Sequence, residues 1–206
     1  MICGIVGQAR VGKDTFAGYL TKCLKERFQR NFKCAAFAAP LKSMCKDHFG
    51  LSDEQLWGDK KEELTEFVRN PVEGNWTTRE IMQALGSFYR YIDYDFWVKA
   101  LDRYLISNDI KDTIITDVRY VNECEFVKTN NGVLIKIVRG DADEIHGTNH
   151  DSETALNDMP SGYFDIEINN CGTLEDLYTA AEDSSDAIII TENMLKKGRT
   201  VKDGKE

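Results

Sequence analysis

A short stretch near the N-terminus constrains the fold of this chain more than any other feature. Residues 7–14 read G-Q-A-R-V-G-K-D, follow the apolar run 2–6 and precede a helical pattern. Glycines let a backbone wrap a chain of phosphates, N–H groups at a helix N-terminus donate to it, and Lys13 can reach the β- and γ-phosphates. A Gly-rich turn with a solvated lysine is the alternative, but strand, loop and helix together indicate a phosphate-binding loop.

The residue after Lys13 departs from the usual pattern of such loops. Ser or Thr normally stands there to hold magnesium, whereas this chain has Asp14 followed by Thr15. A carboxylate can hold a hydrated Mg²⁺ ion beside the phosphates. The alternative is an acid stabilised by the positive end of the helix dipole, and the two roles are compatible.

The rest of the chain alternates short apolar runs with amphipathic stretches, which is typical of a parallel sheet with crossover helices. The expected strands cover residues 2–6, 32–38, 113–116, 132–138 and 164–168. The expected helices cover residues 13–28, a short stretch from Pro40, 77–92, 96–105, 121–128 and 174–181. Residues 51–74 are polar and weakly periodic and predict a mobile segment, and residues 139–158 predict a loop or lid.

Apolar spacing predicts which sides of two helices are buried. The expected buried stripe of the helix at 77–92 is Ile81, Leu85, Phe88 and Ile92. The expected inward residues of the helix at 96–105 are Trp97, Leu101 and Tyr104.

Composition limits the class of protein. A chain of 206 residues with 42% hydrophobic residues can bury one core, and no apolar run approaches the roughly 20 residues that span a membrane. The net charge of −9 argues against a broad nucleic-acid-binding surface, so a phosphorylated ligand needs a local group of Lys and Arg. Six separated cysteines without a secretory signal predict reduced thiols and a cytoplasmic location.

A second polar pair follows a predicted strand. In I-I-T-D-V-R, Asp117 lies at the carboxyl end of the apolar residues and Arg119 lies two residues further on. Parallel sheets bind ligands at this edge, where an arginine can clamp a phosphate or offset charge during phosphoryl transfer. A strand-end acid can instead be a helix cap. Beside a phosphate-binding loop, the ligand-binding interpretation is favoured.

Other charged and metal-ligating residues give weaker signals. Three basic residues lie close to apolar segments: Lys42, Arg79 and Lys99. Each one alone is more often a solvated surface charge. His146 and His150 lie four residues apart, but the Gly and Asn between them indicate a loop, which does not fix zinc ligands.

Several short motifs occur in order along the chain. They are G-K-D-T at 12–15, A-P-L-K at 39–42, I-M-Q-A-L-G at 81–86, F-W-V-K at 96–99, D-V-R at 117–119, H-D-S-E at 150–153 and N-C-G-T-L-E-D-L at 170–177. In these motifs the sequence resembles the deoxynucleoside monophosphate kinases of tailed bacteriophages and, more distantly, animal-type phosphomevalonate kinase. The resemblance covers residues 1–180.

The resemblance implies a P-loop NTPase with the nucleoside monophosphate kinase-like fold. This is an α/β protein with a five-stranded parallel sheet and helices on both faces. ATP with Mg²⁺ is the implied donor and a deoxynucleoside monophosphate the implied acceptor. We expect one kinase domain over residues 1–184, with an acceptor-binding helical region at 51–105, the lid at 139–158 and a flexible tail at 185–206.

The resemblance also assigns roles to residues. ATP is expected at the loop residues Gly7, Arg10, Val11, Gly12, Lys13, Asp14 and Thr15, with Asn170 near the adenine. Mg²⁺ is expected at Asp14 and Asp117. The expected acceptor-side residues are Lys42, Arg79, Trp97, Lys99, Asp117, Arg119 and Glu153. Independently of the resemblance, aromatic residues cluster at 88–97, where two expected helices meet; most are expected in the core, and Tyr91 and Trp97 are the candidates to stack on an acceptor base. The residues expected to act in the transfer itself are Lys13, Asp14, Lys42 and Arg119.

Two alternative functions stay open. The chain could phosphorylate another small phosphorylated molecule, such as phosphomevalonate, or it could bind nucleotides without catalysis. The second alternative is disfavoured by the cations Lys42, Arg79 and Arg119. We expect neither a nucleic-acid polymer nor a membrane as a partner, leave a homodimer open, and expect the host cytoplasm as the location if the protein is phage-encoded.

Overall fold

The computed structural model describes residues 1–70, 72–140, 155–156, 158–160 and 162–202, with side chains through Lys197. The chain forms two compact units. The first unit contains residues 1–36 and 105–206, and the second contains residues 37–104. Each unit is described by itself.

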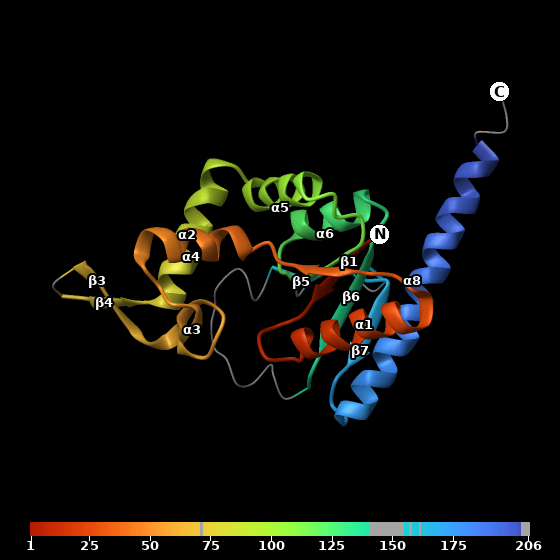
Figure 1. Ribbon diagram of the computed structural model, residues 1–206. Helices are drawn as coiled ribbons and strands as arrows, with labels where there is room; N and C mark the ends of the chain where they lie inside the picture. The colour runs from red at the N-terminus through yellow and green to blue at the C-terminus, as the bar shows by residue number, and fades with distance from the viewer. Residues whose placement is uncertain (71, 141–154, 157, 161, 203–206) are drawn as a thin grey trace. The chain divides into compact units, whose positions relative to one another are not determined.

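The first unit is built on a five-stranded parallel sheet (Figure 1). Its strands are β1 (Ile2–Val6), β2 (Lys33–Ala35), β5 (Thr113–Val118), β6 (Val133–Val138) and β7 (Ile166–Asn169), in the order β2-β5-β1-β6-β7. The prediction of five parallel strands is confirmed. The observed strands β2 and β7 are shorter than expected, and β5 runs two residues further, so that Asp117 lies within the strand.

Helices cover both faces of this sheet, as the alternating pattern predicted. The helices α1 (Lys13–Phe28) and α8 (Leu174–Lys202) lie against one face, and α6 (Val121–Thr129) lies against the other (Figure 1). Phe16 and Leu20 of α1 are fully buried with Ile5 of β1 in one apolar core. On the opposite face Gly4 is required, because a Cβ atom there would come within 3.0 Å of the side chains of α6 and the neighbouring strands.

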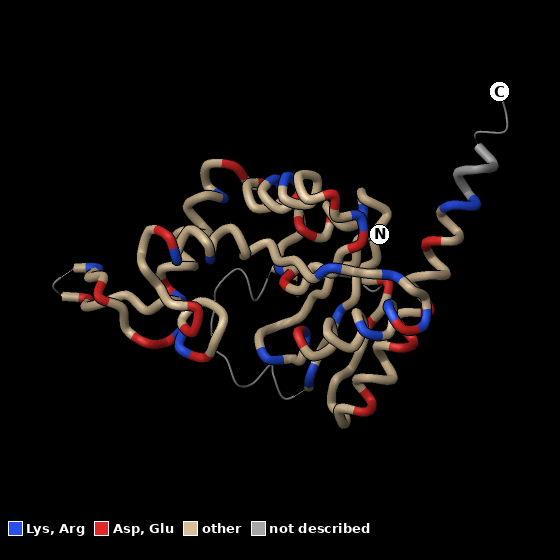
Figure 2. Tube along the Cα trace, in the orientation of Figure 1, with Lys and Arg blue, Asp and Glu red and all other residues tan. Residues whose placement is uncertain are grey.

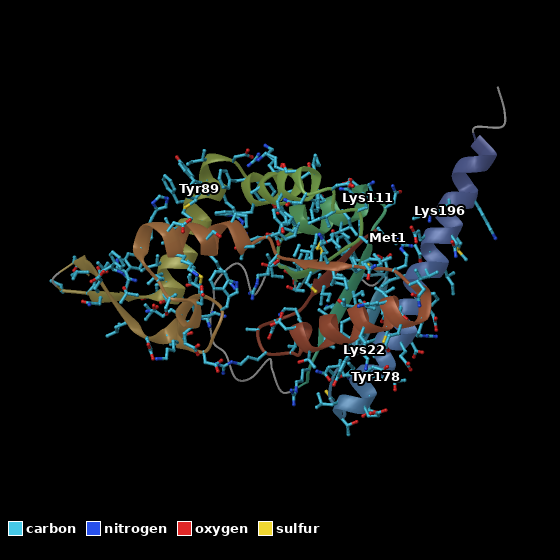
Figure 3. The ribbon with its side chains drawn as sticks, in the orientation of Figure 1. Met1, Lys22, Tyr89, Lys111, Tyr178 and Lys196 are labelled. Carbon is cyan, nitrogen blue, oxygen red and sulfur yellow. The ribbon has the colours of Figure 1, made fainter. Side chains whose placement is uncertain are left out.

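The helix α8 extends 21 residues beyond its expected end at residue 181, to Lys202, so the described part of the expected tail, residues 185–202, is helical. Ser184, Ser185 and Ile188 are buried on α8. Nearer the start of α8, Lys22 of α1 lies over the ring of Tyr178, 5.8 Å from its centre (Figure 3). The sequence analysis therefore underestimated the length of a helix that packs along α1.

A cluster of charges anchors the distal part of α8. The Arg30 guanidinium donates hydrogen bonds to Glu192 of α8 and, at 2.7 and 3.0 Å, to both carboxylate oxygens of Asp112. The N-terminal amine of Met1 also donates to Asp112, at 2.9 Å. The hydrogen bond from Arg30 lowers the pKa of Glu192. Burial by itself would raise the pKa of Asp112, but the bonds from Arg30 and the amine outweigh it and lower that pKa.

The second unit is mainly helical and contains one hairpin. Its elements are α2 (Ala39–Phe49), α3 (Asp53–Leu56), the 3₁₀ helix η1 (Lys60–Glu62), β3 (Leu64–Asn70), β4 (Gly74–Thr77), α4 (Thr78–Ile92) and α5 (Phe96–Ser107), whose last residues belong to the first unit. The expected helices at Pro40, 77–92 and 96–105 are confirmed. Thr77 and Glu80 cap α4 reciprocally, which fixes where that helix begins.

The segment at 51–74 was expected to be mobile; its described residues form α3, η1 and the antiparallel pair β3–β4, elements that the sequence analysis did not predict. Polar contacts hold the hairpin together. The Thr65 hydroxyl donates to the Trp76 carbonyl at 2.7 Å, the Asn75 amide donates to the Thr65 carbonyl at 2.6 Å, and the Arg69 guanidinium lies 3.9 Å from the centre of the Trp76 ring. The hairpin is held by polar contacts rather than by an apolar face. The sequence of these strands therefore does not alternate apolar and polar residues, and it did not predict strands.

The predicted apolar stripes of two helices are only partly buried. Ile81, Trp97 and Leu101 are buried as expected. In contrast, Phe88, Ile92 and Tyr104 are 56%, 61% and 52% exposed. The reason in α4 is that Tyr89, one position beyond Phe88, is the residue that packs on the rings of Phe96 and Trp97.

Charges and cysteines are distributed through the described residues. Lys and Arg are interspersed with Asp and Glu along the described elements (Figure 2). All six cysteines fall in the described part of the chain and are free thiols, four of them buried. Burial raises the pKa of Cys3 to about 12. None of the helices among the described residues is long and apolar enough to cross a bilayer.

The anchored helix yields a prediction about stability. Glu192→Gln should lower the free energy of unfolding by about 2 kcal/mol at pH 7, because it leaves Arg30 without its ionised partner on α8. The pKa of Glu192 is lower in the folded state than its unfolded value of about 4.3, so its contribution is present above that pH and is lost as the pH falls below it. Denaturant unfolding at pH 7 and at pH 3 should therefore show the two proteins converging at the lower pH.

The matched control is Asp183→Asn, an exposed acid on the same helix, which should change the unfolding free energy by less than about 0.5 kcal/mol. A difference between the wild type and Glu192→Gln that persists unchanged at acid pH would contradict the ionic anchor.

Candidate functional site

The parallel register brings four chain segments of the first unit to one edge of the sheet. Val6 at the end of β1 pairs with Val118 of β5 and with Lys136 of β6, and Val138 of β6 pairs with Asn169 of β7. Neighbouring strands lie about 4.8 Å apart. The chain therefore leaves β1, β5, β6 and β7 side by side at their carboxyl ends, where parallel sheets bind ligands.

The loop from Gly7 to Gly12 has the backbone shape that its glycines predicted. Gly7 and Gly12 have φ angles of +156° and +96°, and Arg10 between them has a φ of +66°. A Cβ atom on Gly7 would lie 2.5 Å from the Ile137 carbonyl oxygen, so β6 leaves room only for glycine. Gly12 is the N-cap of α1, and no side chain caps this end of the helix. The loop is therefore continuous with the helix N-terminus, whose first backbone N–H groups have no acceptor within the helix.

Lys13 lies inside this loop. Its side chain is buried, and its amine donates a hydrogen bond of 2.7 Å to the Gly7 carbonyl and a second one to the Gln8 carbonyl. The amine is thus held by the same backbone that would surround a phosphate chain. This placement supports the phosphate-binding interpretation over a solvated surface lysine.

The residues expected to hold magnesium lie on two neighbouring segments. Asp14 and Thr15 are exposed in the first turn of α1, and Asp117 is half-buried near the end of β5. Among the described residues, no group of three or more His, Cys, Asp and Glu side chains could hold a metal ion by itself. A hydrated ion held by one carboxylate together with phosphate oxygens matches this donor set.

Arg119 lies in a turn that is fixed by a buried carboxylate. Glu123 is 2% exposed, and its Oε2 accepts hydrogen bonds from the backbone N–H groups of Arg119, at 2.7 Å, and Tyr120, at 3.2 Å. This carboxylate joins the end of β5 to the start of α6. The spacing of the two residues suggests Glu123 as an ion-pair partner of Arg119, but it did not lead us to expect that the carboxylate accepts from backbone N–H groups, although an acid three residues after a helix N-cap is a recognisable signal.

Asn170 lies directly after β7 and contacts the loop. Its side-chain Nδ2 donates to the Val11 carbonyl at 2.9 Å, and its backbone N–H donates to the Val138 carbonyl at 2.8 Å. The first unit therefore brings together the loop, Asp117, Arg119 and Asn170.

The other expected acceptor-side residues lie in the second unit. The Lys42 amine is 5.4 Å from the centre of the half-exposed Trp57 ring, Arg79 pairs with Glu62, and Lys99 pairs with Asp93 at 2.6 Å. The hydrogen bond from Lys99 lowers the pKa of Asp93.

Trp97 is a correction among the expected acceptor-side residues. It is 2% exposed and donates its indole N–H to the Gly86 carbonyl, so it belongs to the core and offers no face to a base. Tyr91 is 90% exposed. Glu153, His146 and His150, together with most of the expected lid, lie outside the described residues.

The fold and the loop define a class of protein. The parallel sheet has the order β2-β5-β1-β6-β7, a glycine-bounded loop joins its central strand to α1, and the buried first lysine of α1 donates back to that loop. These features define a P-loop nucleotide-binding α/β protein.

The chain belongs to the deoxynucleotide monophosphate kinase family, whose sequence model matches residues 32–181. A protein of Acanthamoeba polyphaga mimivirus that carries the provisional name deoxynucleotide monophosphate kinase is 31% identical over 199 residues, covering 87% of this chain and 93% of its own length. The deoxynucleotide monophosphate kinase of Escherichia phage RB69 is 32% identical over 126 residues, covering 59% of this chain and 49% of its own.

The matched region of the phage enzyme is thus about half of its length. A solved structure of shikimate kinase from Aquifex aeolicus covers 92% of this chain and 99% of its own, with 14% identity and a TM-score of 0.44, which is too weak a likeness to bear on function.

The Arg119 turn yields the second prediction. Glu123→Ala should lower the free energy of unfolding by about 1–3 kcal/mol and should speed hydrogen exchange at the amides of Arg119 and Tyr120, because both lose their acceptor. The control Glu125→Ala removes an exposed acid from the same helix and should leave both amides unchanged. Equal exchange at these two amides in wild type and Glu123→Ala would show that the carboxylate does not fix the turn.

Proposed function

We propose that this chain transfers the terminal phosphoryl group of ATP to the phosphate of a deoxynucleoside monophosphate, giving ADP and a deoxynucleoside diphosphate. The observation that carries the proposal is the buried Lys13 amine inside the loop, in a chain that belongs to the deoxynucleotide monophosphate kinase family. Family membership supports a deoxynucleoside monophosphate as the acceptor, and the loop with Lys13 supports ATP as the phosphate donor.

The donor side is formed by the loop and the N-terminus of α1. Backbone N–H groups of Gly7, Arg10, Val11 and Gly12 are proposed to surround the phosphates, with Lys13 exchanging its bonds to the Gly7 and Gln8 carbonyls for bonds to phosphate oxygens. The Asp14 and Asp117 carboxylates are the groups proposed to hold hydrated Mg²⁺, with Thr15 as a hydroxyl neighbour. Bound Mg²⁺ would neutralise charge on the β- and γ-phosphates.

The acceptor side is proposed to use the basic residues expected from the sequence. Arg119 is fixed by Glu123 at the strand end next to the loop, and we propose that it grips the transferring or the acceptor phosphate with its planar guanidinium. Lys42, Arg79, Lys99 and Glu153 remain the proposed acceptor contacts.

The chemistry needs positioning more than proton transfer. An acceptor phosphate oxygen is already ionised at neutral pH, so it can attack the γ-phosphorus in line without a strong general base. The chain's contribution is then to hold the two substrates in line and to offset the charge of the transferred group, which Lys13, Lys42 and Arg119 are proposed to do. A cytoplasmic location, which is the host cytoplasm if the protein is phage-encoded, and a possible homodimer stay predictions from the sequence.

The third prediction tests this function through its central lysine. Lys13→Ala should reduce ADP release with ATP, Mg²⁺ and a deoxynucleoside monophosphate by about 100-fold or more, because a preorganised cation at the transferred group is lost. A coupled ADP-release assay measures the change, and circular dichroism checks that the variant is folded. The matched control is Lys25→Ala, an exposed lysine on the same helix, which should keep wild-type turnover. A folded Lys13→Ala protein with near-normal turnover would exclude this loop as the donor site.

A further inference from the structure

We infer that Asn170 is a positioning residue that fixes the shape of the phosphate-binding loop by holding the Val11 carbonyl, rather than a residue that contacts adenine. The inference rests on the proposed function, because it assigns a task within the proposed ATP site. The contact that carries it is the 2.9 Å hydrogen bond from the Asn170 Nδ2 to the Val11 oxygen. Val11 belongs to the loop expected to bind phosphates, so this amide lies at the phosphate end of the site rather than at its base end.

Asn170 is itself rigidly placed. Its backbone N–H donates to Val138 at 2.8 Å, which continues the β6–β7 pairing one residue beyond β7. Three residues later, Thr173 and Asp176 cap the start of α8: the Asp176 carboxylate accepts from the Thr173 N–H at 2.7 Å, and the Asp176 N–H donates to the Thr173 hydroxyl at 3.2 Å. The side chain thus projects from a segment tied to the sheet on one side and to a capped helix on the other.

The loop fits closely against this amide. Gly12 follows Val11 with a φ of +96°, and a Cβ atom on Gly12 would lie 2.6 Å from the Asn170 Nδ2. A larger residue at position 12 would therefore push Asn170 off the carbonyl as well as strain the backbone. The absence of a side chain at Gly12 thus makes room for the Asn170 amide.

The contact sets the direction of a backbone N–H. The structure contains no cis peptide bond among its described residues, so in the peptide between Val11 and Gly12 the carbonyl and the N–H point in opposite directions. Because the Val11 carbonyl points to Asn170, the Gly12 N–H points away from it. If this peptide turned over, the loop would present a carbonyl oxygen where it now presents a donor, which would repel a phosphate. Asn170 opposes that turn.

The sharpest variant is Asn170→Asp, which keeps the shape of the side chain and replaces the donor by an oxygen that cannot donate when ionised. The matched control is Asn169→Asp, which adds the same charge at the adjacent, exposed position at the end of β7. Three quantities are measured: hydrogen exchange of a peptide covering residues 7–16 without nucleotide, the dissociation constant for ATP with Mg²⁺, and the dissociation constant for the deoxynucleoside monophosphate alone.

For Asn170→Asp we expect faster exchange in the loop peptide and ATP binding weakened by at least about tenfold, the size expected when a hydrogen-bonded carbonyl loses its donor. Binding of the deoxynucleoside monophosphate alone should stay within twofold of wild type. Asn169→Asp should match the wild type in all three measurements. If Asn170→Asp does not fold, Asn170→Ala removes the donor without adding charge and is subjected to the same measurements with the same expected direction.

Two outcomes would overturn the inference. In the first, Asn170→Asp weakens ATP binding without changing exchange in the nucleotide-free loop, which would indicate that Asn170 contacts adenine instead. In the second, ATP binding is unchanged, which would show that Asn170 does not contribute to the ATP site. Failure of the proposed function gives a different result. In that case the wild-type protein itself binds no ATP, or binds it without transferring phosphate. The loop exchange of wild type and Asn170→Asp can still be compared without nucleotide, so the positioning role of Asn170 is tested separately.

Discussion

The pairing of β1 with β5 on one side and with β6 on the other is the constraint on which the rest of the site depends. Because the strands are parallel and Val6 is in register with Val118, the phosphate-binding loop and the Arg119 turn leave the sheet next to each other. Burial of Ile5 and Cys3 under α1 holds β1 in that register, since a shift by one residue would turn these side chains to the opposite face.

Side chains from later in the sequence then fix what the sheet has brought together. Glu123 ties the Arg119 turn to α6, and Asn170 ties the loop to the end of β7. Each uses a single side chain to satisfy backbone groups that would otherwise be left at a sheet edge. The backbone of the proposed site is therefore held by side chains that need not touch a substrate, in line with phosphoryl transfer by positioning and charge stabilisation.

Local patterns predicted the parallel sheet, α1 and the loop, because the signals for these elements, glycine spacing and apolar runs, each lie within a few consecutive residues. They failed where long-range contacts decide the structure. The end of α8 is held by Arg30, 162 positions from Glu192, and the β3–β4 hairpin is held by polar contacts around Thr65 and Trp76. The pattern also could not separate a core tryptophan from a base-stacking one, and Trp97 proved to be core. Family membership, rather than geometry, favours a deoxynucleoside monophosphate over phosphomevalonate as the acceptor.

The most direct test of the account is to follow the label from ATP carrying ³²P in its γ-phosphate. The purified full chain is incubated with Mg²⁺ and each of dAMP, dCMP, dGMP and dTMP, with phosphomevalonate as the comparison acceptor, and the products are separated by chromatography. The account predicts that the label appears in at least one deoxynucleoside diphosphate and that its transfer requires both Mg²⁺ and the monophosphate. Label found only in inorganic phosphate, or only on phosphomevalonate, would contradict it.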